Sequence, residues 1–276
     1  MRNYMIRLLC FFAAVICLPP AIGAAAVPAD FSTDIGGEPQ ENCGEEGPKL
    51  VAITFDDGPN PITTEQLLDG LAARGAKATF FILGQSIDES ICSEKVPKNR
   101  ALVKRMIKEG HVVGNHSYSH PLLSKCSKEK VREELTRTSE LIKELTGAYP
   151  IYMRPPGGAA ATAPWVREIA NPMITVCWGY FDTKDWKYKN KERIVKIIVD
   201  HVIDGDIILL HDNYVTSVEA ALEAIDILQA RGFQFVTVDT LLKRNMTEGM
   251  ALDPRLIYYI MPPGDTSKLV KAEDLP

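Results

Sequence analysis

Residues 49–59 read KLVAITFDDGP, and this stretch decides the fold. An apolar, β-branched run at 50–55 leads directly into two carboxylates, a glycine and a proline. A continuous apolar run of this length is typical of a strand buried on both faces, as in a parallel sheet. We therefore expect a parallel strand whose carboxyl end carries polar side chains.

Six more segments of this kind follow, separated by amphipathic stretches. Strands are expected at 78–83, 111–114, 151–153, 174–177, 207–210 and 233–236. Between two of them, Val131, Leu135, Ile142 and Leu145 share one helical face, and Gly147 ends that helix. This alternation predicts an α/β fold with about seven parallel strands, in a barrel shorter than the usual eightfold one. A doubly wound open sheet is the alternative, but no glycine-rich dinucleotide loop follows the first strand.

Composition and charge exclude several classes of protein. The 276 residues are 46% hydrophobic and 24% charged, which is ordinary for a globular chain and rules out disordered, collagen-like and coiled-coil proteins. The net charge is −5 and no long Lys/Arg run occurs, so we expect no nucleic-acid partner. The only long apolar stretch lies at the N-terminus, which excludes a multi-span membrane protein.

That N-terminal stretch is typical of an export signal. Arg2 and Arg7 precede a short apolar core at 8–17, and prolines and small residues follow it. The core is too short to span a bilayer comfortably, so a cleaved signal peptide at 1–26 is favoured over a stable membrane span. We expect an exported protein that is extracellular, periplasmic or associated with the cell wall. After the signal we expect a leader at 27–48, a catalytic domain at 49–243 and a C-terminal tail at 244–276. The tail is either packed on the domain or trailing from it. The protein is expected to be monomeric.

Signal cleavage leaves four cysteines, Cys43, Cys92, Cys126 and Cys177. None forms a C-x-x-C pair, which argues against a zinc-thiolate site. In an oxidising compartment they are either disulfides or free thiols. Cys92 and Cys126 fall on neighbouring loops at one end of the expected barrel, so a disulfide between them is predicted, with four free thiols as the alternative.

Polar residues cluster just after the expected strands in five places. They read TFDDGP at 54–59, NHSYSH at 115–120, RPPGG at 154–158, DTKDW at 182–186 and LLHD at 209–212. In a parallel barrel these places converge on one face, where sites are built from strand carboxyl ends. Taken singly, each has an ordinary explanation as a turn, a surface histidine or a core tryptophan. Their convergence predicts a site.

The residue types at these places suit hydrolysis assisted by a metal. His116 and His120 are four residues apart, and with Asp57 they would make a two-histidine, one-carboxylate site with open positions. Arg154 beside Asp56 would keep that carboxylate ionised and aimed. A histidine that ends an apolar strand, as His211 does, is a natural general acid or base. His111 and His201 are interpreted instead as structural or surface groups.

The five motifs in this order resemble the polysaccharide deacetylases, carbohydrate esterase family 4, also called the NodB-homology domain. The resemblance runs from about residue 50 to about residue 242. It implies a distorted (β/α) barrel that removes N-acetyl groups from sugar polymers with a divalent metal. Zinc is the expected metal, and cobalt, nickel and manganese also suit imidazole and carboxylate ligands.

Residue by residue, the resemblance implies a role for each motif. It implies that Asp57, His116 and His120 are the metal ligands. Asp56 would be the general base, held by Arg154, and His211 the general acid, tuned by Asp185. Trp186 and Leu209 would form walls of the acetyl-binding groove. The family often has an aromatic residue where Gly157 stands. Gly157 retains the backbone N–H expected to stabilise the oxyanion, but it offers no side chain to the substrate.

Three functions are compatible with these motifs. The first is an N-deacetylase of an N-acetylglucosamine-containing polysaccharide or oligosaccharide, such as peptidoglycan or a chitin-like glycan. The second is an O-acetyl xylan esterase with the same machinery. The third is a catalytically silent sugar-binding barrel, which would require a lost ligand or acid, and all of these residues are present.

Overall fold

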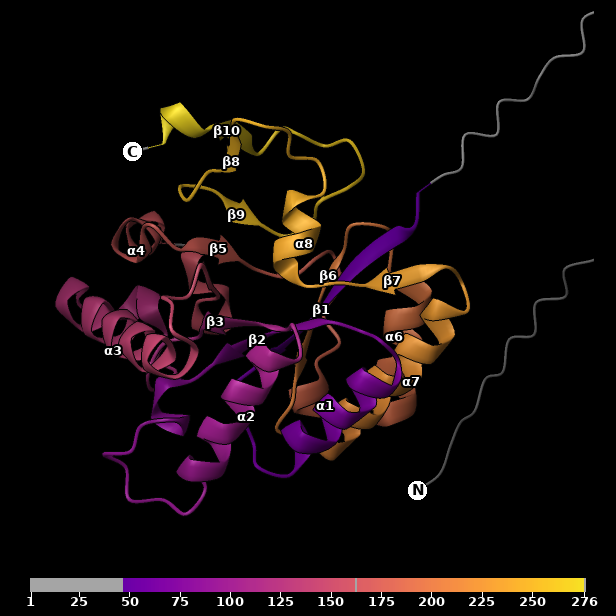
Figure 1. Cartoon of the computed structure of the whole chain (residues 1–276), viewed down its shortest axis with the longest axis horizontal. Coiled ribbons are helices and arrows are strands. Elements are labelled where there is room, and N and C mark those ends of the chain that lie inside the picture. The colour runs from indigo at the N-terminus through magenta and orange to yellow at the C-terminus, as the bar shows by residue number, and fades with distance from the viewer. Residues whose placement is uncertain (1–46, 162, 276) are drawn as a thin grey trace, which may run out of the picture. The chain divides into compact units, whose positions relative to one another are not determined.

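The computed structural model describes residues 47–161 and 163–275 (Figure 1). The expected signal peptide, nearly all of the leader and Cys43 lie outside the described residues. Within them, no helix has the length and apolar character needed to cross a membrane.

The seven expected strands are all present and belong to one sheet. They are β1 (Lys49–Asp56), β2 (Ala78–Ile82), β3 (Val112–Asn115), β4 (Tyr152–Met153), β5 (Ile174–Val176), β6 (Ile207–His211) and β7 (Phe233–Phe235). The strand order is β6-β1-β2-β3-β4-β5-β9, and β7 pairs with β1. Every pairing between these strands is parallel. The expected α/β class with parallel strands is therefore confirmed.

The two ends of this sheet are joined through the C-terminal segment. Strand β9 (Ile257–Tyr258) pairs with β5, and an isolated bridge then connects Ile260 to Asp206, just before β6. Met261 N also donates to Gly205 O at 2.9 Å. The described part of 244–276 is thus packed on the domain rather than trailing from it. Strands β8 (Met250–Leu252) and β10 (Leu269–Lys271) form a separate antiparallel pair.

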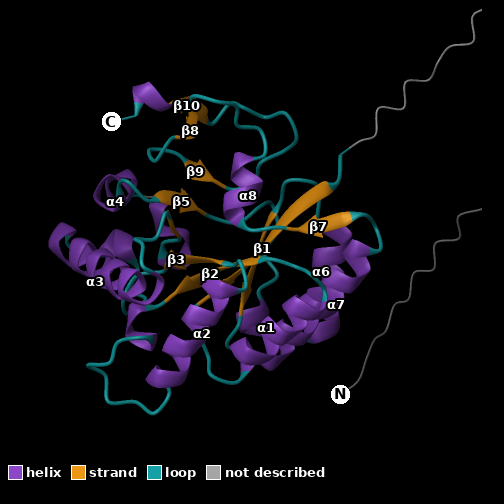
Figure 2. Cartoon of the chain, in the orientation of Figure 1, coloured by secondary structure: helices purple, strands orange, loops and turns teal. Residues whose placement is uncertain are grey.

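Helices surround the sheet, as Figure 2 shows. They are α1 (Thr63–Ala73), α2 (Val96–Lys108), α3 (Lys128–Thr146), α4 (Pro164–Ala170), α5 (Asp185–Tyr188), α6 (Lys191–His201), α7 (Val215–Gln229) and α8 (Val238–Lys243), with short 3-10 turns η1 (Gly84–Ser86), η2 (Leu123–Lys125), η3 (Pro156–Ala161) and η4 (Ala272–Asp274). Helix α3 ends at Gly147 as expected, because that residue adopts a left-handed conformation with φ of 84°.

The largest apolar core lies between β1, β2 and β6 and the helices α1, α6 and α7. Phe55, Leu67 and Leu228 are among its fully buried members. Strand β1 is buried on both faces, because Val51, Ile53 and Phe55 belong to this core and Ala52 belongs to a second one. This explains why its sequence is continuously apolar rather than alternating. The core thus holds the central strands rigidly, so that their carboxyl ends can carry a site.

The expected Cys92–Cys126 disulfide is wrong, since both cysteines are free in the structure. Cys92 is exposed, whereas Cys126 packs against the apolar cluster around Leu123 and Met153. Its Sγ lies 3.7 Å from Leu122 O. Loops on neighbouring strands can share one end of a barrel without bringing two Sγ atoms into bonding geometry.

His111 is structural, as expected, and it makes stability depend on pH. Its buried ring accepts a hydrogen bond at Nδ1 from Ala78 N at 3.1 Å. Burial, together with the Lys77 cation, lowers the pKa of His111 to about 4. The unfolded chain, with an ordinary pKa near 6.5, then binds this proton first, so stability falls as the pH falls from about 6.5 toward 4.

We therefore predict that the melting temperature of the wild type falls more steeply between pH 7 and pH 5 than that of His111→Gln. The glutamine oxygen can still accept from Ala78 N but does not titrate. Thermal melts at matched ionic strength measure both slopes. Equal slopes would contradict a neutral, buried His111.

Candidate active site

The five motifs converge where the strands end. Asp56 is the last residue of β1, Asn115 of β3, Met153 of β4 and His211 of β6. Side chains from the first, second and last of these motifs meet at Asp57, which lies within 4 Å of three imidazoles. The expected convergence is therefore present in the geometry.

Asp57, His116 and His120 form a candidate metal site. One ligand atom from each lies within 4.8 Å of the others. Asp57 Oδ1 is 3.4 Å from His116 Nε2 and 3.3 Å from His120 Nε2. This oxygen is buried and makes no geometrically sound hydrogen bond with the described residues, so a cation between the three atoms would supply its missing partner. The donor set of two imidazoles and one carboxylate fits a divalent transition metal.

Electrostatics keep the Asp57 carboxylate ionised. Burial alone would raise the pKa of Asp57, but the close approach of His116, with the charges of His120 and His211, lowers it overall. Asp57 and His120 also adopt left-handed backbone conformations, with φ of 71° and 61°. Such conformations cost of order 1 kcal/mol or more in a residue with a side chain, and they cluster at functional sites.

The ring of His116 is oriented by the backbone of the third motif. Its Nδ1 donates to Arg154 O at 2.7 Å, which leaves the Nε2 lone pair for a metal. The loop that carries both histidines is held by Glu134, a nearly fully buried residue of α3. The Glu134 carboxylate accepts from Tyr118 N at 2.8 Å and from Ser119 N at 2.7 Å. The sequence analysis missed Glu134, although an acid on the apolar face of α3 is a signal for such a role.

Arg154 holds Asp56 in a wholly buried contact, as expected. Arg154 Nη1 donates to Asp56 Oδ1 at 2.8 Å and to Thr54 Oγ1 at 2.7 Å. Its Nη2 donates to Cys177 O at 2.8 Å. Removing one partner of such a pair leaves a buried charge uncompensated. The second oxygen, Asp56 Oδ2, is 3.6 Å from His116 Nε2 and so faces the metal ligands.

The partly exposed His211 and the fully buried Asp185 form a second pair. His211 Nδ1 is 2.9 Å from Asp185 Oδ1, and Asp185 Oδ2 accepts from His211 N at 2.8 Å and from Ser217 Oγ at 2.7 Å. Burial lowers the pKa of His211, but the hydrogen bond and charge of Asp185, with the charges of Asp56 and Asp57, raise it overall to about 9. A cation held by Asp57 would offset part of that rise. Ser217, which fixes Asp185, was not predicted.

A buried carboxylic acid lies beneath the Asp57 loop and was also missed. A Cβ at Gly58 would lie 2.3 Å from Asp212 Oδ1, so only glycine fits there. Thr64 Oγ1 donates to Asp212 Oδ2, and burial raises the pKa of Asp212 to about 7. The position of Asp212, directly after His211, was the available signal.

The three predicted groove residues differ in exposure. Trp186 is 49% exposed, whereas Leu209 is buried within β6. Gly157 and Gly158 adopt successive left-handed conformations, with φ of 61° and 71°, which glycine adopts without strain. A Cβ at Gly157 would meet only Leu122 Cδ1, at 3.5 Å. No hydrogen bond or ion pair in the described part of the chain links these three residues to Asp57, so their role in substrate binding stays a prediction.

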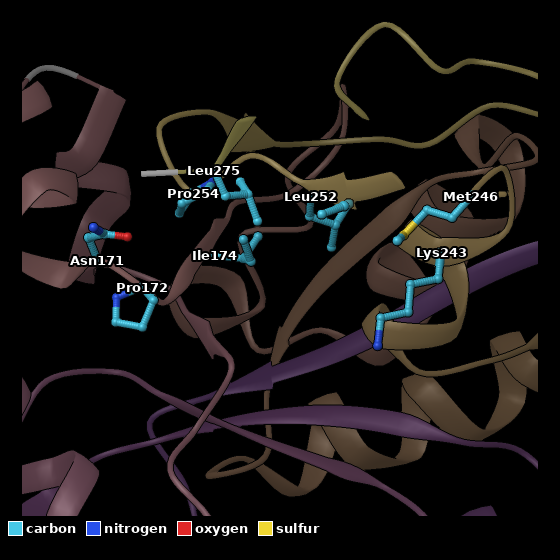
Figure 3. A pocket seen from close by; sticks show the side chains of 9 residues that line it. Asn171, Pro172, Ile174, Lys243, Met246, Leu252, Pro254 and Leu275 are labelled. Carbon is cyan, nitrogen blue, oxygen red and sulfur yellow. The ribbon is translucent and has the colours of Figure 1, made fainter. Parts of the chain in front are cut away.

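A separate cavity of about 280 Å³ lies away from this site (Figure 3). It is mainly apolar and is bounded by β5, the end of α8 and the C-terminal segment, including Ile174, Met246 and Leu252. Ile174 begins β5, whereas the candidate site follows the carboxyl ends of strands. None of the predicted site residues lines this cavity, and it contains no group of metal-binding side chains.

Comparison with known proteins agrees with the geometry. The family model for polysaccharide deacetylase matches residues 44–171. The chain is 39% identical, over 204 residues, to the peptidoglycan-N-acetylmuramic acid deacetylase PdaC of Bacillus subtilis, and the match covers 74% of this chain. It covers only 41% of that relative, so this chain spans about two fifths of its length.

Two shorter relatives are matched almost entirely. A peptidoglycan-N-acetylglucosamine deacetylase of Bacillus cereus is 36% identical over 199 residues, which is 71% of this chain and 89% of that protein. Among solved structures, a family 4 acetyl xylan esterase from Clostridium thermocellum, in complex with a cobalt ion, is 32% identical with a TM-score of 0.68. That match covers 78% of this chain and 100% of the esterase chain.

Proposed function

The chain belongs to the polysaccharide deacetylase family, and from this premise we propose that it is a metal-dependent hydrolase that removes N-acetyl groups from an N-acetylglucosamine-containing polysaccharide, either peptidoglycan or a chitin-like glycan. One observation carries the proposal. Two separately held proton carriers, Asp56 on Arg154 and His211 on Asp185, reach the same set of metal ligands, at 3.6 Å and 3.9 Å. Hydrolysis of an amide needs such a base and such an acid.

Asp57, His116 and His120 would hold the metal. When bound there, a divalent metal polarises the acetyl carbonyl and lowers the pKa of water. Asp56 takes a proton from the attacking water as the new C–O bond forms. The backbone N–H of Gly157 donates to the developing oxyanion, an interaction worth about 2.7–4 kcal/mol in comparable sites. The C–N bond then breaks, His211 Nε2 gives its proton to the leaving amine, and the products are acetate and a free amino sugar.

Zinc is the metal we propose, because two imidazoles and a carboxylate suit it, with cobalt, nickel and manganese as alternatives. The related esterase that binds cobalt supports a divalent metal at this kind of site. Elemental analysis of the protein purified without added metal tests the assignment.

We further propose export after cleavage of a signal peptide at 1–26, with the leader at 27–48 and a monomeric catalytic domain that begins at residue 49. The charge and apolar pattern of the N-terminus supports export, as does the similarity to deacetylases that are named for the cell-wall polymer peptidoglycan. N-terminal sequencing of the secreted protein tests the cleavage, and light scattering tests the oligomeric state.

Acetate release from peptidoglycan, chitin oligomers and acetylated xylan is the decisive experiment. We expect release from at least one of the first two, loss of at least about 100-fold on treatment with a chelator, and recovery on addition of zinc. Release only from xylan would favour the esterase. No release from any of the three, with metal present, would favour the catalytically silent barrel.

A further inference from the structure

A polar pocket opens beside the candidate metal ligands, and none of the five motifs accounts for it. It has a volume of about 280 Å³, and Asp57 forms part of its wall. The remaining wall comes from the loop after β1, from η1 and the loop that follows it, from the start of α2 and from the residue that follows Asp212. Helices α1 and α2, which flank these loops, lie next to each other in Figure 1. The pocket is therefore continuous with the candidate active site.

One wall residue presents a buried acceptor without a partner. Asn99, the fourth residue of α2, is only 4% exposed. Its Nδ2 donates to Ser86 O at 2.9 Å, which fixes the orientation of the amide. Its Oδ1 is buried and makes no hydrogen bond with any described residue. Since buried acceptors in proteins are nearly always paired, this oxygen lacks a donor that a ligand in the pocket would supply.

Two more side-chain amides in the wall have no hydrogen-bond partner among the described residues. Gln85 and Asn213 are each partly buried, and neither side chain hydrogen-bonds to another residue in the described ranges. Asn60, in the same wall, differs because its Oδ1 already accepts from Ile62 N at 3.0 Å and so serves the local turn. Gln85, Asn99 and Asn213 together offer donors and acceptors to a ligand.

The chemistry of the wall selects a neutral, polyhydroxylated ligand. Apart from Asp57 and the exposed Lys95, its lining side chains are uncharged, and they include the hydroxyls of Ser86 and Ser93. Amide and hydroxyl groups pair with sugar hydroxyls without the desolvation cost of an ion. The volume lies just below the 300–1,000 Å³ that is typical of small-molecule sites, which suits about one sugar ring.

We propose that Gln85, Asn99 and Asn213 form a subsite for the sugar unit next to the one that is deacetylated. The inference rests on the proposed function for the identity of the polymer. A glycan whose acetylated unit lies at Asp57 has its neighbouring ring within reach of this pocket, because Asp57 belongs to both. The hydroxyls of that ring supply the donor that Asn99 Oδ1 lacks.

Binding of tetra-N-acetylchitotetraose, followed by NMR titration of the zinc-loaded protein, tests the subsite. All variants carry Asp56→Asn, which is expected to slow turnover about 10²–10⁴-fold during the titration. We expect the double variant Gln85→Ala/Asn213→Ala to bind the tetramer about tenfold more weakly than its parent, which corresponds to about 1.4 kcal/mol from two amides. Gln66→Ala, an exposed amide on α1 outside the pocket, is the matched control and should bind as the parent does.

The outcomes separate the subsite from the proposed function. A double variant that binds the tetramer as tightly as its parent, or a parent that does not bind it, overturns the subsite. Acetate release is measured on the corresponding proteins with Asp56 intact. A tenfold loss of binding with no acetate release from any polymer would support the subsite and overturn the deacetylase. Because neither the Gln85 nor the Asn213 side chain hydrogen-bonds to another described residue, thermal melts should show the double variant folded.

Discussion

Asp56→Asn should lower turnover about 10²–10⁴-fold while leaving the metal content near that of the wild type. The asparagine oxygen can still accept from Arg154 Nη1, which now donates to Asp56 Oδ1 at 2.8 Å, so the buried arginine keeps a partner. What is lost is the capacity to take a proton from water. Acetate release and elemental analysis on the same preparation measure the two effects.

Asp57→Asn is the matched comparison, one residue along the chain. It removes the anionic ligand that would bind the metal together with His116 and His120, so metal content and activity should fall together. Asparagine tolerates the left-handed conformation at this position better than most residues, which makes the change a fair test of ligation rather than folding. If both variants kept the same metal content and the same activity, the division of roles between the two carboxylates would be wrong.

His211→Ala should damage amide hydrolysis by about 10²–10⁴-fold and damage hydrolysis of an aryl acetate far less. An amine leaves poorly unless it is protonated. The phenolate of a phenol with a low pKa leaves without protonation. The chain keeps His211 as a proton carrier through Asp185, whose two oxygens bind the ring and the backbone of the histidine. Acetate release from chitin oligomers and from 4-nitrophenyl acetate gives the two ratios.

His201→Ala provides the control histidine. His201 lies at the end of α6, where its Nδ1 is 2.9 Å from Ile197 O. Within the described residues, no hydrogen bond or ion pair joins it to the candidate ligands. Its replacement should leave the rate of hydrolysis of both the amide and the ester unchanged. An identical loss on amide and ester in His211→Ala would show that the residue does not protonate the leaving group.

Local sequence was sufficient for the strands, the end of α3 at Gly147 and the candidate metal ligands. Apolar runs such as 50–55 predict buried strands because a strand covered on both faces admits few polar side chains. The polar groups that follow them could be assigned to one face because parallel strands all end at the same edge. Asp57, His116 and His120 are therefore together in the structure as the spacing indicated.

Other features depend on contacts between segments that are far apart in the chain. The pairing of β9 with β5 involves only Ile257 and Tyr258 on one side, too short a run for any periodic signal. Glu134 reaches the histidine loop only because α3 packs beside β3, and on sequence alone it is one acid among many on a helix. The free state of Cys92 and Cys126 likewise depends on tertiary placement, because Cys126 packs against an apolar cluster whereas Cys92 is exposed.

The sequence by itself thus determined which residues could perform the chemistry, because residue type and strand-end position are local properties. Only the tertiary structure decided how those residues are held and what surrounds them. Three features result from packing between distant segments: the contact of Glu134 with the histidine loop, the closure of the sheet at Asp206, and the place of Asn99 in a pocket that Asp57 also lines. Packing of this kind depends on the shapes of many side chains at once, and no short stretch of sequence encodes it.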